Sequence, residues 1–416
     1  MLDIQFIRDN PQKVRQGALD KQLGAEVVDR VLELDQQRRD LIPRVEQLRQ
    51  QSNELQRQIK GRKPTEEELV QGRELKEQLK LIEPQLRELE TQFEEAMLWV
   101  PNVPAHDVPI APDESGNQVV KTVGDKPQFE FETKTHAQLL EARDLLNTKK
   151  AAEVAGSRAY YLRGKAMLLE QALLQYALQF MVQKGFTPFS VPLLVNQDAF
   201  VNTGYGPWGL EDIFRTQDGQ GLIGTAEVPL TAYYQNETLR EDDLPIKMVG
   251  LSSCFRREVG SYGKDTKGVF RVHSFNKVEQ VVYTVADENI TREWHDKMLG
   301  FVEELLQSLG LHYQVLLMCS GDMGAGQRRK YDVETWFPGE GRFRETHSDS
   351  YFNDFQSRRL NIRYQAKDGS LKYVYTLNNT VAATPRLMAA VVENYQTEDG
   401  DFEIPEVLKP FMPLLK

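Results

Sequence analysis

Hydrophobic residues recur at alternating steps of three and four positions through residues 31–59, and a similar spacing returns through residues 68–96. This heptad pattern is typical of the seam of a coiled coil. The second run is preceded by Thr65 and includes Glu68, a pairing that indicates a capping box at the start of a helix. Because only the short segment KGRKP separates the two runs, we expect two helices, over about residues 27–98, that pair antiparallel as a hairpin.

The pattern changes after this hairpin. Residues 101–125 are rich in proline and turn-forming residues, and we expect them to link an N-terminal domain, residues 1–100, to a second domain, residues 126–416. In the second domain a helical run that stops at Gly185 is followed by alternating runs, among them PIKMVGLSSCFRRE and VFRVHSFNKVEQVVY, that predict strands. Strands and helices do not alternate regularly. The sequence therefore predicts an α+β domain, an antiparallel sheet flanked by helices, rather than a doubly wound parallel sheet.

The composition narrows the class of protein. The chain has 416 residues, a net charge of −11 and 40% hydrophobic residues, which suits a globular protein of two or three domains. It has only two cysteines and begins without an apolar segment, and no later apolar run approaches ~18 residues; we therefore expect a cytoplasmic protein without membrane contact. The negative net charge disfavours general binding to DNA, so a polyanionic partner has to be held by a local basic cluster.

One basic cluster lies at the turn of the predicted hairpin, where Lys60, Arg62 and Lys63 fall within four residues. Such a turn is either ordinary solvated surface or the point at which a long arm contacts a large polyanion such as RNA. For the arm as a whole, a dimerisation or scaffold coiled coil is the alternative interpretation.

A second basic cluster lies in the glycine-rich stretch CFRREVGSYGKDTKGVFRVHSF, which includes Lys264 and Lys267. The chain has no P-loop, no dinucleotide-binding fingerprint, no zinc-ligand spacing and no G-x-S-x-G elbow. If this stretch binds phosphates, it therefore has to do so without a glycine cradle.

The second cluster reads as two strands joined by a loop. Period two places Arg256 and Glu258 on one face of the first strand, and it allows Arg271, Phe275 and Glu279 to share a face of the second. Fixed arginines bind phosphate oxygens, an aromatic ring can stack on a base, and carboxylates can hold an amine. From the residues alone, a salt-bridged hairpin is the simpler interpretation.

The same stretch resembles motif 2 of the class II aminoacyl-tRNA synthetases. Together with TAEVPLT, RETHS, TLNNTVAATPRLMAAVVENYQ and the N-terminal arm, it is similar to the seryl-tRNA synthetase family in order and spacing, over essentially the whole chain. The resemblance implies activation of serine with ATP to seryl-adenylate, and transfer of serine to the 3′ end of tRNA(Ser), and of tRNA(Sec) where that occurs. It also implies a homodimer, with Pro192 as the motif 1 proline at the dimer interface.

The resemblance implies roles for particular residues. Arg256, Glu258, Arg271, Glu279 and Arg386 are the implied catalytic residues. The implied ATP-binding residues are Arg256, Arg257, Glu258, Val272, Phe275, Glu345, Thr346, His347, Ser348 and Arg386. The implied serine-binding residues are Thr225, Ala226, Glu227, Arg256, Glu279, Asn378 and Thr380. Mg²⁺ is implied at Glu345 and Ser348, and contact with tRNA at Lys60, Arg62 and Lys63.

Two positions, Asp349 and Tyr351, depart from the commonest family pattern, and Tyr351 replaces a common asparagine. Asp349 stands where cysteine is frequent, and its carboxylate either alters metal binding or points away from the metal. Two alternatives to a serine–tRNA ligase are a paralogue that forms an aminoacyl-adenylate and loads a carrier protein, and a catalytically inactive coiled-coil interaction protein. The presence of the arm disfavours the first, and the presence of Arg256, Glu279 and Arg386 disfavours the second.

Overall fold

The computed structural model describes residues 1–260, 263, 265 and 268–412. The chain divides into two units, Met1–Pro101 and Asn102–Lys416. Among the described residues, no helix combines the length and the apolar character needed to cross a bilayer.

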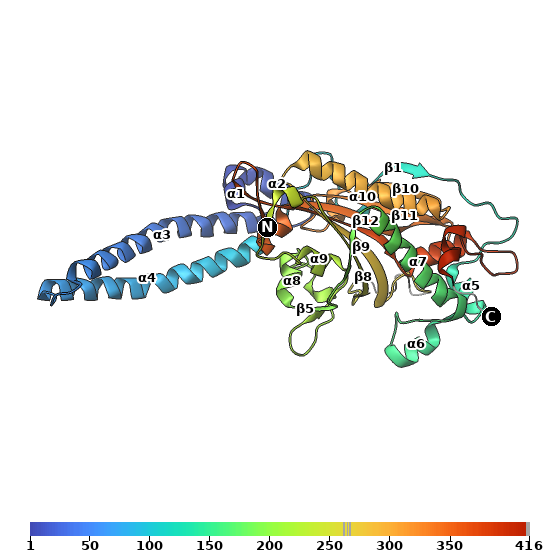
Figure 1. The fold of residues 1–416 in the computed structure, drawn as a ribbon, viewed down its shortest axis with the longest axis horizontal. Coiled ribbons are helices and arrows are strands. Elements are labelled where there is room, and N and C mark those ends of the chain that lie inside the picture. Colours follow the sequence, from blue (N-terminus) through green and yellow to red (C-terminus); the bar gives the residue numbers. More distant parts are fainter. Residues whose placement is uncertain (261–262, 264, 266–267, 413–416) are drawn as a thin grey trace. The chain divides into compact units, whose positions relative to one another are not determined.

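The first unit is a helical hairpin preceded by two short helices. Its helices are α1 (Ile4–Asp9), α2 (Pro11–Asp20), α3 (Glu26–Ile59) and α4 (Glu66–Leu98). The two long helices α3 and α4 pack side by side (Figure 1), with Val45 of α3 against Ile82 and Leu86 of α4. Arg30 of α3 contacts Gln92 of α4, and Arg49, later in α3, contacts Glu83, earlier in α4. The two helices are therefore antiparallel, as expected.

The start of α4 has the expected capping box. The Thr65 hydroxyl accepts a hydrogen bond from the Glu68 backbone N–H, and the Glu68 carboxylate accepts one from the Thr65 N–H at 2.8 Å. These two bonds satisfy N–H groups that have no partner within the helix, so the local sequence alone specifies where α4 begins.

The second unit is built on one eight-stranded sheet with the strand order β1-β10-β11-β12-β15-β9-β8-β4. Neighbouring strands are antiparallel except for β4 and β8, which are parallel. This confirms the α+β class with a mostly antiparallel sheet. The strands of the sheet are β1 (Gln118–Val123), β4 (Thr187–Ser190), β8 (Ile246–Phe255), β9 (Ser274–Thr284), β10 (Tyr313–Leu317), β11 (Arg329–Phe337), β12 (Arg342–Asn353) and β15 (Tyr375–Ala383).

Smaller elements complete the second unit. Its helices are α5 (His136–Ala142), α6 (Thr148–Ala155), α7 (Gly164–Gln183), α8 (Gln197–Asn202), α9 (Glu227–Thr231), α10 (Glu288–Ser308), α11 (Phe355–Leu360) and α12 (Arg386–Asn394). Its minor strands are β2 (Leu146–Asn147), β3 (Tyr161–Leu162), β5 (Leu194–Val195), β6 (Gly221–Leu222), β7 (Thr238–Arg240), β13 (Arg363–Gln365) and β14 (Leu371–Tyr373). Short 3₁₀ turns are η1 (Glu114–Gly116), η2 (Leu210–Asp212), η3 (Glu241–Asp243), η4 (Ser320–Asp322) and η5 (Glu406–Phe411).

The sequence predicts a linker over residues 101–125, but residues 102–125 belong to the second unit. Its strand β1 pairs with β10 at one edge of the sheet, and the buried Asn102 side chain donates hydrogen bonds to the carbonyls of Gly326 and Phe352. The prolines that suggest a linker therefore mark irregular backbone packed into the second unit, where Ala105 and Val108 join the hydrophobic core, rather than a free connection.

The two faces of the sheet have different environments. Helices α7 and α10 lie along one face (Figure 1), where Val278 and Val282 of β9 form part of a core with Met298 and Val302 of α10. Alternation along β9 turns Lys277 and Glu279 to the opposite face. That opposite face carries the candidate site.

Candidate active site

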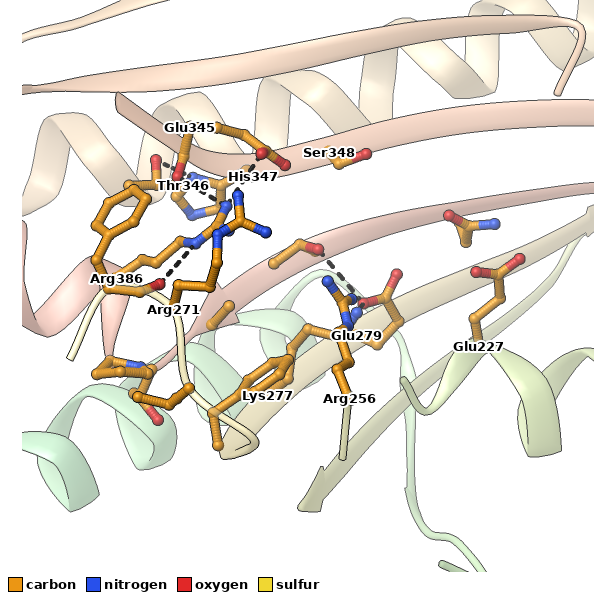
Figure 2. A pocket seen from close by; sticks show the side chains of 18 of the residues that line it. Glu227, Arg256, Arg271, Lys277, Glu279, Glu345, Thr346, His347, Ser348 and Arg386 are labelled. Carbon is orange, nitrogen blue, oxygen red and sulfur yellow. Dashed lines mark hydrogen bonds and ion pairs between the residues drawn. The ribbon is translucent and has the colours of Figure 1, made fainter. Parts of the chain in front are cut away.

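A cavity of about 310 Å³ opens on the face of the sheet away from α10. Its walls come from the β8–β9 connection, strands β9, β11, β12 and β15, and the start of α12. In Figure 2, Arg256 lies beside Glu279, whereas Arg271 and Arg386 lie toward Glu345. Most of the residues for which the resemblance implies catalysis, ATP binding or serine binding line this one cavity: Glu227, Arg256, Glu258, Arg271, Val272, Phe275, Glu279, Glu345, Thr346, His347, Ser348, Asn378, Thr380 and Arg386.

One end of the cavity is polar and deeply buried. Lys277 Nζ lies 2.5 Å from Glu279 Oε2, and the Thr380 hydroxyl donates to the same carboxylate oxygen at 3.5 Å. Thr380 faces Glu279 across the β15–β9 ladder, so strand register sets this contact. A small ligand with an amine and a hydroxyl would find both an anionic and a neutral polar partner here.

Glu227 at the start of α9 forms the far wall of this end. Its carboxylate accepts hydrogen bonds from the Tyr205 hydroxyl at 2.8 Å and from the Gln356 amide at 2.9 Å. Burial, together with the nearby Glu279 carboxylate, raises the pKa of Glu227 to about 7. Thr225 and Ala226 are buried behind Glu227, where the Thr225 hydroxyl accepts a hydrogen bond from the Glu227 N–H, and they do not line the cavity.

The three cavity arginines differ in their partners. Arg271 pairs with Glu258 at 2.6 Å and with Asp265 at 3.5 Å, and Arg386 pairs with Glu345 at 3.0 Å. Arg256 donates from Nε to the Gly224 carbonyl at 3.4 Å and lies over the Phe275 ring, but it makes no ion pair with any residue in the described part of the chain. Its charge is therefore the one left for an anionic ligand to neutralise.

The backbone that carries these arginines corrects one expectation from the sequence. Strand β8 ends at Phe255 and β9 begins at Ser274, so Arg256, Glu258 and Arg271 lie in the connection rather than on strand faces. Glu258 has a φ of 56°, a left-handed conformation that ends the period-two pattern. The sequence-based placement of Arg256 and Glu258 on one strand face is thus wrong, although both residues reach the cavity.

Glu345 and Ser348 share the cavity because strand β12 is irregular. Residues three apart on a regular strand point to opposite faces. The β11–β12 register shifts between Val333 and Glu334, which leaves Thr346 as an extra residue on β12. This bulge lets Glu345 and Ser348 both face the cavity, as Figure 2 shows.

The donor atoms around Glu345 fit a hard cation. Burial alone would raise the pKa of Glu345, but Arg386, Lys330 and Arg256 outweigh it and lower the pKa to about 2, so the carboxylate is anionic. Asp332, which faces Ser348 across the strand ladder, has a buried Oδ1 with no hydrogen-bond partner among the described residues. Carboxylate and hydroxyl oxygens are the ligand type that Mg²⁺ prefers.

Asp349, which departs from the commonest family pattern, points away from the cavity. Its carboxylate is buried on the α10 side of the sheet, with Oδ2 3.7 Å from His295 Nε2, and burial raises its pKa well above the ordinary value. Alternation along β12 separates it from Ser348, which explains why it does not line the cavity.

The structure also brings in residues that sequence reasoning missed. Tyr205, Phe270, Lys277, Gln327 and Lys330 line the cavity. Alternation could have identified Lys277, because it has the same parity as Phe275 and Glu279. No local signal marks Tyr205 or Lys330, which come from distant segments of the chain.

A few predicted residues lie elsewhere. Arg257 is exposed and donates to the Glu211 carbonyl in a separate hollow beside Phe214, so it does not reach the cavity. Lys264 and Lys267 lie outside the described residues.

The basic turn belongs to the first unit. There Lys60, Arg62 and Lys63 are exposed, and Arg62 forms two hydrogen bonds with Glu68.

Comparison with known proteins first identifies the class. Residues 213–395 match the family profile described as "tRNA synthetase class II core domain (G, H, P, S and T)", so the sheet and its cavity are those of a class II aminoacyl-tRNA synthetase. Residues 1–104 match "Seryl-tRNA synthetase N-terminal domain".

Full-length relatives then identify the family. The chain is 41% identical to a serine–tRNA ligase of Deinococcus radiodurans over 418 residues, covering 99% of this chain and 97% of the relative. It is also similar to the crystal structure of seryl-tRNA synthetase from Pyrococcus horikoshii complexed with ATP, with a TM-score of 0.92, 37% identity, and coverage of 99% of this chain and 98% of the other. A cytoplasmic serine–tRNA ligase of Naegleria fowleri in complex with AMP has a TM-score of 0.88 and 31% identity, with 99% and 97% coverage. The chain belongs to the seryl-tRNA synthetase family.

Proposed function

We propose that the cavity of the second unit forms seryl-adenylate from serine and ATP and then transfers the seryl group to the 3′ end of tRNA(Ser). The observation that carries this proposal is the position of Arg256. Its guanidinium is partly buried, has no ion-pair partner among the described residues, and lies between the pocket formed by Glu279 and Thr380 and two further arginines. The serine–tRNA ligase activity of the relatives and the ATP complex of one of them support it.

The arginines would carry the first step. The serine carboxylate attacks the α-phosphorus of ATP in line, and pyrophosphate leaves, so negative charge builds on the phosphate oxygens. Arg256 would neutralise the α-phosphate. Arg271 and Arg386 would exchange their present carboxylate partners for phosphate oxygens toward the leaving group.

The adenine would lie on the Phe275 and Val272 side of the cavity, with Glu258 accepting from its amino group. Glu345 and Ser348 would hold Mg²⁺, which when bound neutralises further triphosphate charge. Thr346 and His347, between these two residues on the same bulged strand, also line this part of the cavity.

The carboxylate end of the cavity would select serine. Glu227 and Glu279 would hold the α-amino group, and Thr380 and Asn378, with Glu279, would hydrogen-bond the side-chain hydroxyl. A substrate such as alanine would leave these buried groups unpaired, which is the physical basis for rejecting it. Thr225 would contribute from behind, by holding the Glu227 backbone.

The first unit would bind tRNA through its exposed turn, where Lys60 and Lys63 have no acidic partner among the described residues.

We also propose a cytoplasmic homodimer. The exposed apolar side chains of Leu193 and Leu194, directly after Pro192, support an interface there because such a pair is otherwise placed against water.

Serine-dependent exchange of pyrophosphate into ATP, followed by charging of purified tRNA(Ser), tests the proposal. Both activities are expected. Exchange without charging would point instead to a carrier-loading paralogue, and the absence of both would point to an inactive interaction protein. Omission of serine is the control for exchange, and a tRNA of another specificity is the control for charging.

A further inference from the structure

His136, which lies outside the cavity, connects the motif 3 helix α12 to the β8–β9 connection. It is the first residue of α5 and is 3% exposed. Its Nδ1 lies 2.8 Å from Glu393 Oε1, and its Nε2 accepts a hydrogen bond from the Val269 N–H at 3.4 Å. Because Val269 donates to Nε2, the ring carries its proton on Nδ1 and donates it to Glu393.

Glu393 is a rigid support for this ring. Its side chain is fully buried near the end of α12, where Oε1 also accepts from the His136 backbone N–H at 2.8 Å and Oε2 accepts from the Gly339 N–H at 2.9 Å. A buried carboxylate held by several N–H donors has little freedom to move. Glu393 therefore fixes both the position and the tautomer of His136.

The ring contacts the connection at a point where no side chain fits. A Cβ atom at Gly268 would lie 2.4 Å from His136 Nε2, and Gly268 has a φ of 68°. Glycine is the residue that permits both the backbone conformation and the close approach. The β8–β9 connection therefore packs closely against the His136 imidazole at Gly268 and Val269.

Helix α12 holds the same segment at its other end. Arg386, the first residue of the helix, donates from Nε to the Phe270 carbonyl at 3.3 Å and lies over the Phe270 ring. Positions 386 and 393 are seven residues, about two turns, apart and so lie on one face of the helix. Helix α12 therefore holds residues 268–270 in two ways, directly through Arg386 and indirectly through Glu393 and His136. These residues directly precede Arg271 and Val272 of the cavity.

A cation held by His136, Glu393 and the nearby Glu340 does not account for the arrangement as well. Glu340 already accepts hydrogen bonds from Arg342 at 2.8 Å and Arg344 at 2.6 Å. The Glu393 carboxylate accepts three hydrogen bonds, and His136 uses both ring nitrogens. Hydrogen bonds alone satisfy these groups.

From this chain of contacts we infer that His136 is a positioning residue for ATP: through the Val269 N–H it holds the segment that presents Arg271 and Val272 to the nucleotide. The inference rests on the proposed function of the cavity. It requires the acceptor at Nε2, and not merely a side chain that fills the space.

Two substitutions separate the acceptor from the rest of the ring. His136→Asn keeps a donor for Glu393 but has no acceptor for Val269, whereas His136→Gln places an amide oxygen near the position of Nε2. In ATP–pyrophosphate exchange we expect His136→Asn to raise KM for ATP about tenfold, the loss that corresponds to one buried hydrogen bond. The KM for serine should change less than about twofold, and His136→Gln should recover most of the loss.

A matched control is His312→Asn. His312 is similarly buried, with Nδ1 bonded to the carbonyls of Val123 and Gly124, and lies outside the cavity. The His312→Asn variant should have lower thermal stability but an unchanged KM for ATP. An unchanged KM for ATP in His136→Asn, or an equal rise in both His136 variants, would overturn the inference.

A second variant, on the other side of the contact, tests the inference even if His136→Asn fails to fold. Gly268→Ala, which would push the ring away, should raise KM for ATP selectively; equal increases for ATP and serine would count against the inference. If the wild-type protein shows no exchange, the proposed function fails separately. Titration calorimetry would then still show whether the affinity for MgATP is lower in His136→Asn and is recovered in His136→Gln.

Discussion

Replacement of Arg256 by alanine tests the central contact of the proposed reaction. Within the described residues, Arg256 has no ion pair, so its removal breaks a 3.4 Å hydrogen bond to Gly224 and a contact with Phe275. It also removes a longer-range attraction to the Glu345 carboxylate, which keeps its ion pair with Arg386. The folded protein should therefore lose little stability. The transition state, in contrast, would lose a preorganised charge, and such a contact contributes about 3 to 4 kcal/mol, or 10²- to 10³-fold in kcat/KM.

The assay is serine-dependent ATP–pyrophosphate exchange at varied ATP, with thermal unfolding measured in parallel. Arg256→Lys keeps the charge but not the planar fork, and we expect a loss of about tenfold, between the wild type and the alanine variant. Arg240→Ala is the matched control, because Arg240 is exposed and paired with Asp243 away from the cavity. Its exchange activity should stay within about twofold of the wild type, as for most exposed ion pairs.

Two results would refute this reasoning. Exchange in Arg256→Ala within about tenfold of the wild type would show that the guanidinium does not contact the developing charge. A large drop in unfolding temperature, with activity recovered at low temperature, would show that Arg256 stabilises the fold instead.

Four further predictions follow from other parts of the molecule. Lys60→Ala with Lys63→Ala should weaken tRNA charging and make its log–log salt dependence shallower by about two, while exchange is unchanged; equal loss in both assays would contradict a separate tRNA contact. Thr380→Val should lower kcat/KM for serine ten- to hundredfold, or about 1 to 3 kcal/mol, and reduce selectivity over alanine, measured by exchange with each amino acid. Burial and Glu279 raise the pKa of Glu227 from 4.5 to about 7, so the native state holds a proton that the unfolded state releases, and stability is lost as pH rises through that window. Glu227→Gln should remove this loss of about 3 kcal/mol above pH 7, so the free energy of unfolding measured in urea should vary less with pH; an unchanged pH profile in this variant would contradict the raised pKa of Glu227. Glu345→Ala should raise the Mg²⁺ concentration needed for exchange, and an unchanged requirement would argue against a metal ligand there.

The parts of the fold that depend on nearby residues could be predicted well. The helical hairpin follows from apolar spacing and from the Thr65 and Glu68 box, because helix contacts join residues three or four apart. The antiparallel sheet follows from alternating runs, and the segment KDGS, residues 367–370, forms a turn between β13 and β14, where the Ala366 N–H donates a hydrogen bond to the Ser370 carbonyl.

The site was predictable only in part. Its residue types were identified through family resemblance, but period two misplaced Arg256 and Glu258, because β8 ends at Phe255, three residues before the end of the segment predicted as a strand. Arg257 has the charge expected of a phosphate ligand, yet its side chain points to a different hollow. Charge and spacing do not state which way a loop side chain turns.

The sequence by itself determined where the long helices run, which segments alternate as strands, and which residues have the chemistry to meet a nucleotide, since each of these depends on neighbours along the chain. The tertiary structure decided which of them meet. The Thr346 bulge brings Glu345 and Ser348 to one face, Lys330 and Tyr205 arrive from distant segments, and β1 joins the sheet from a region that looks like a linker. These outcomes depend on strand register and on packing between residues far apart in sequence, and the free energy of such contacts exists only once the whole sheet has formed.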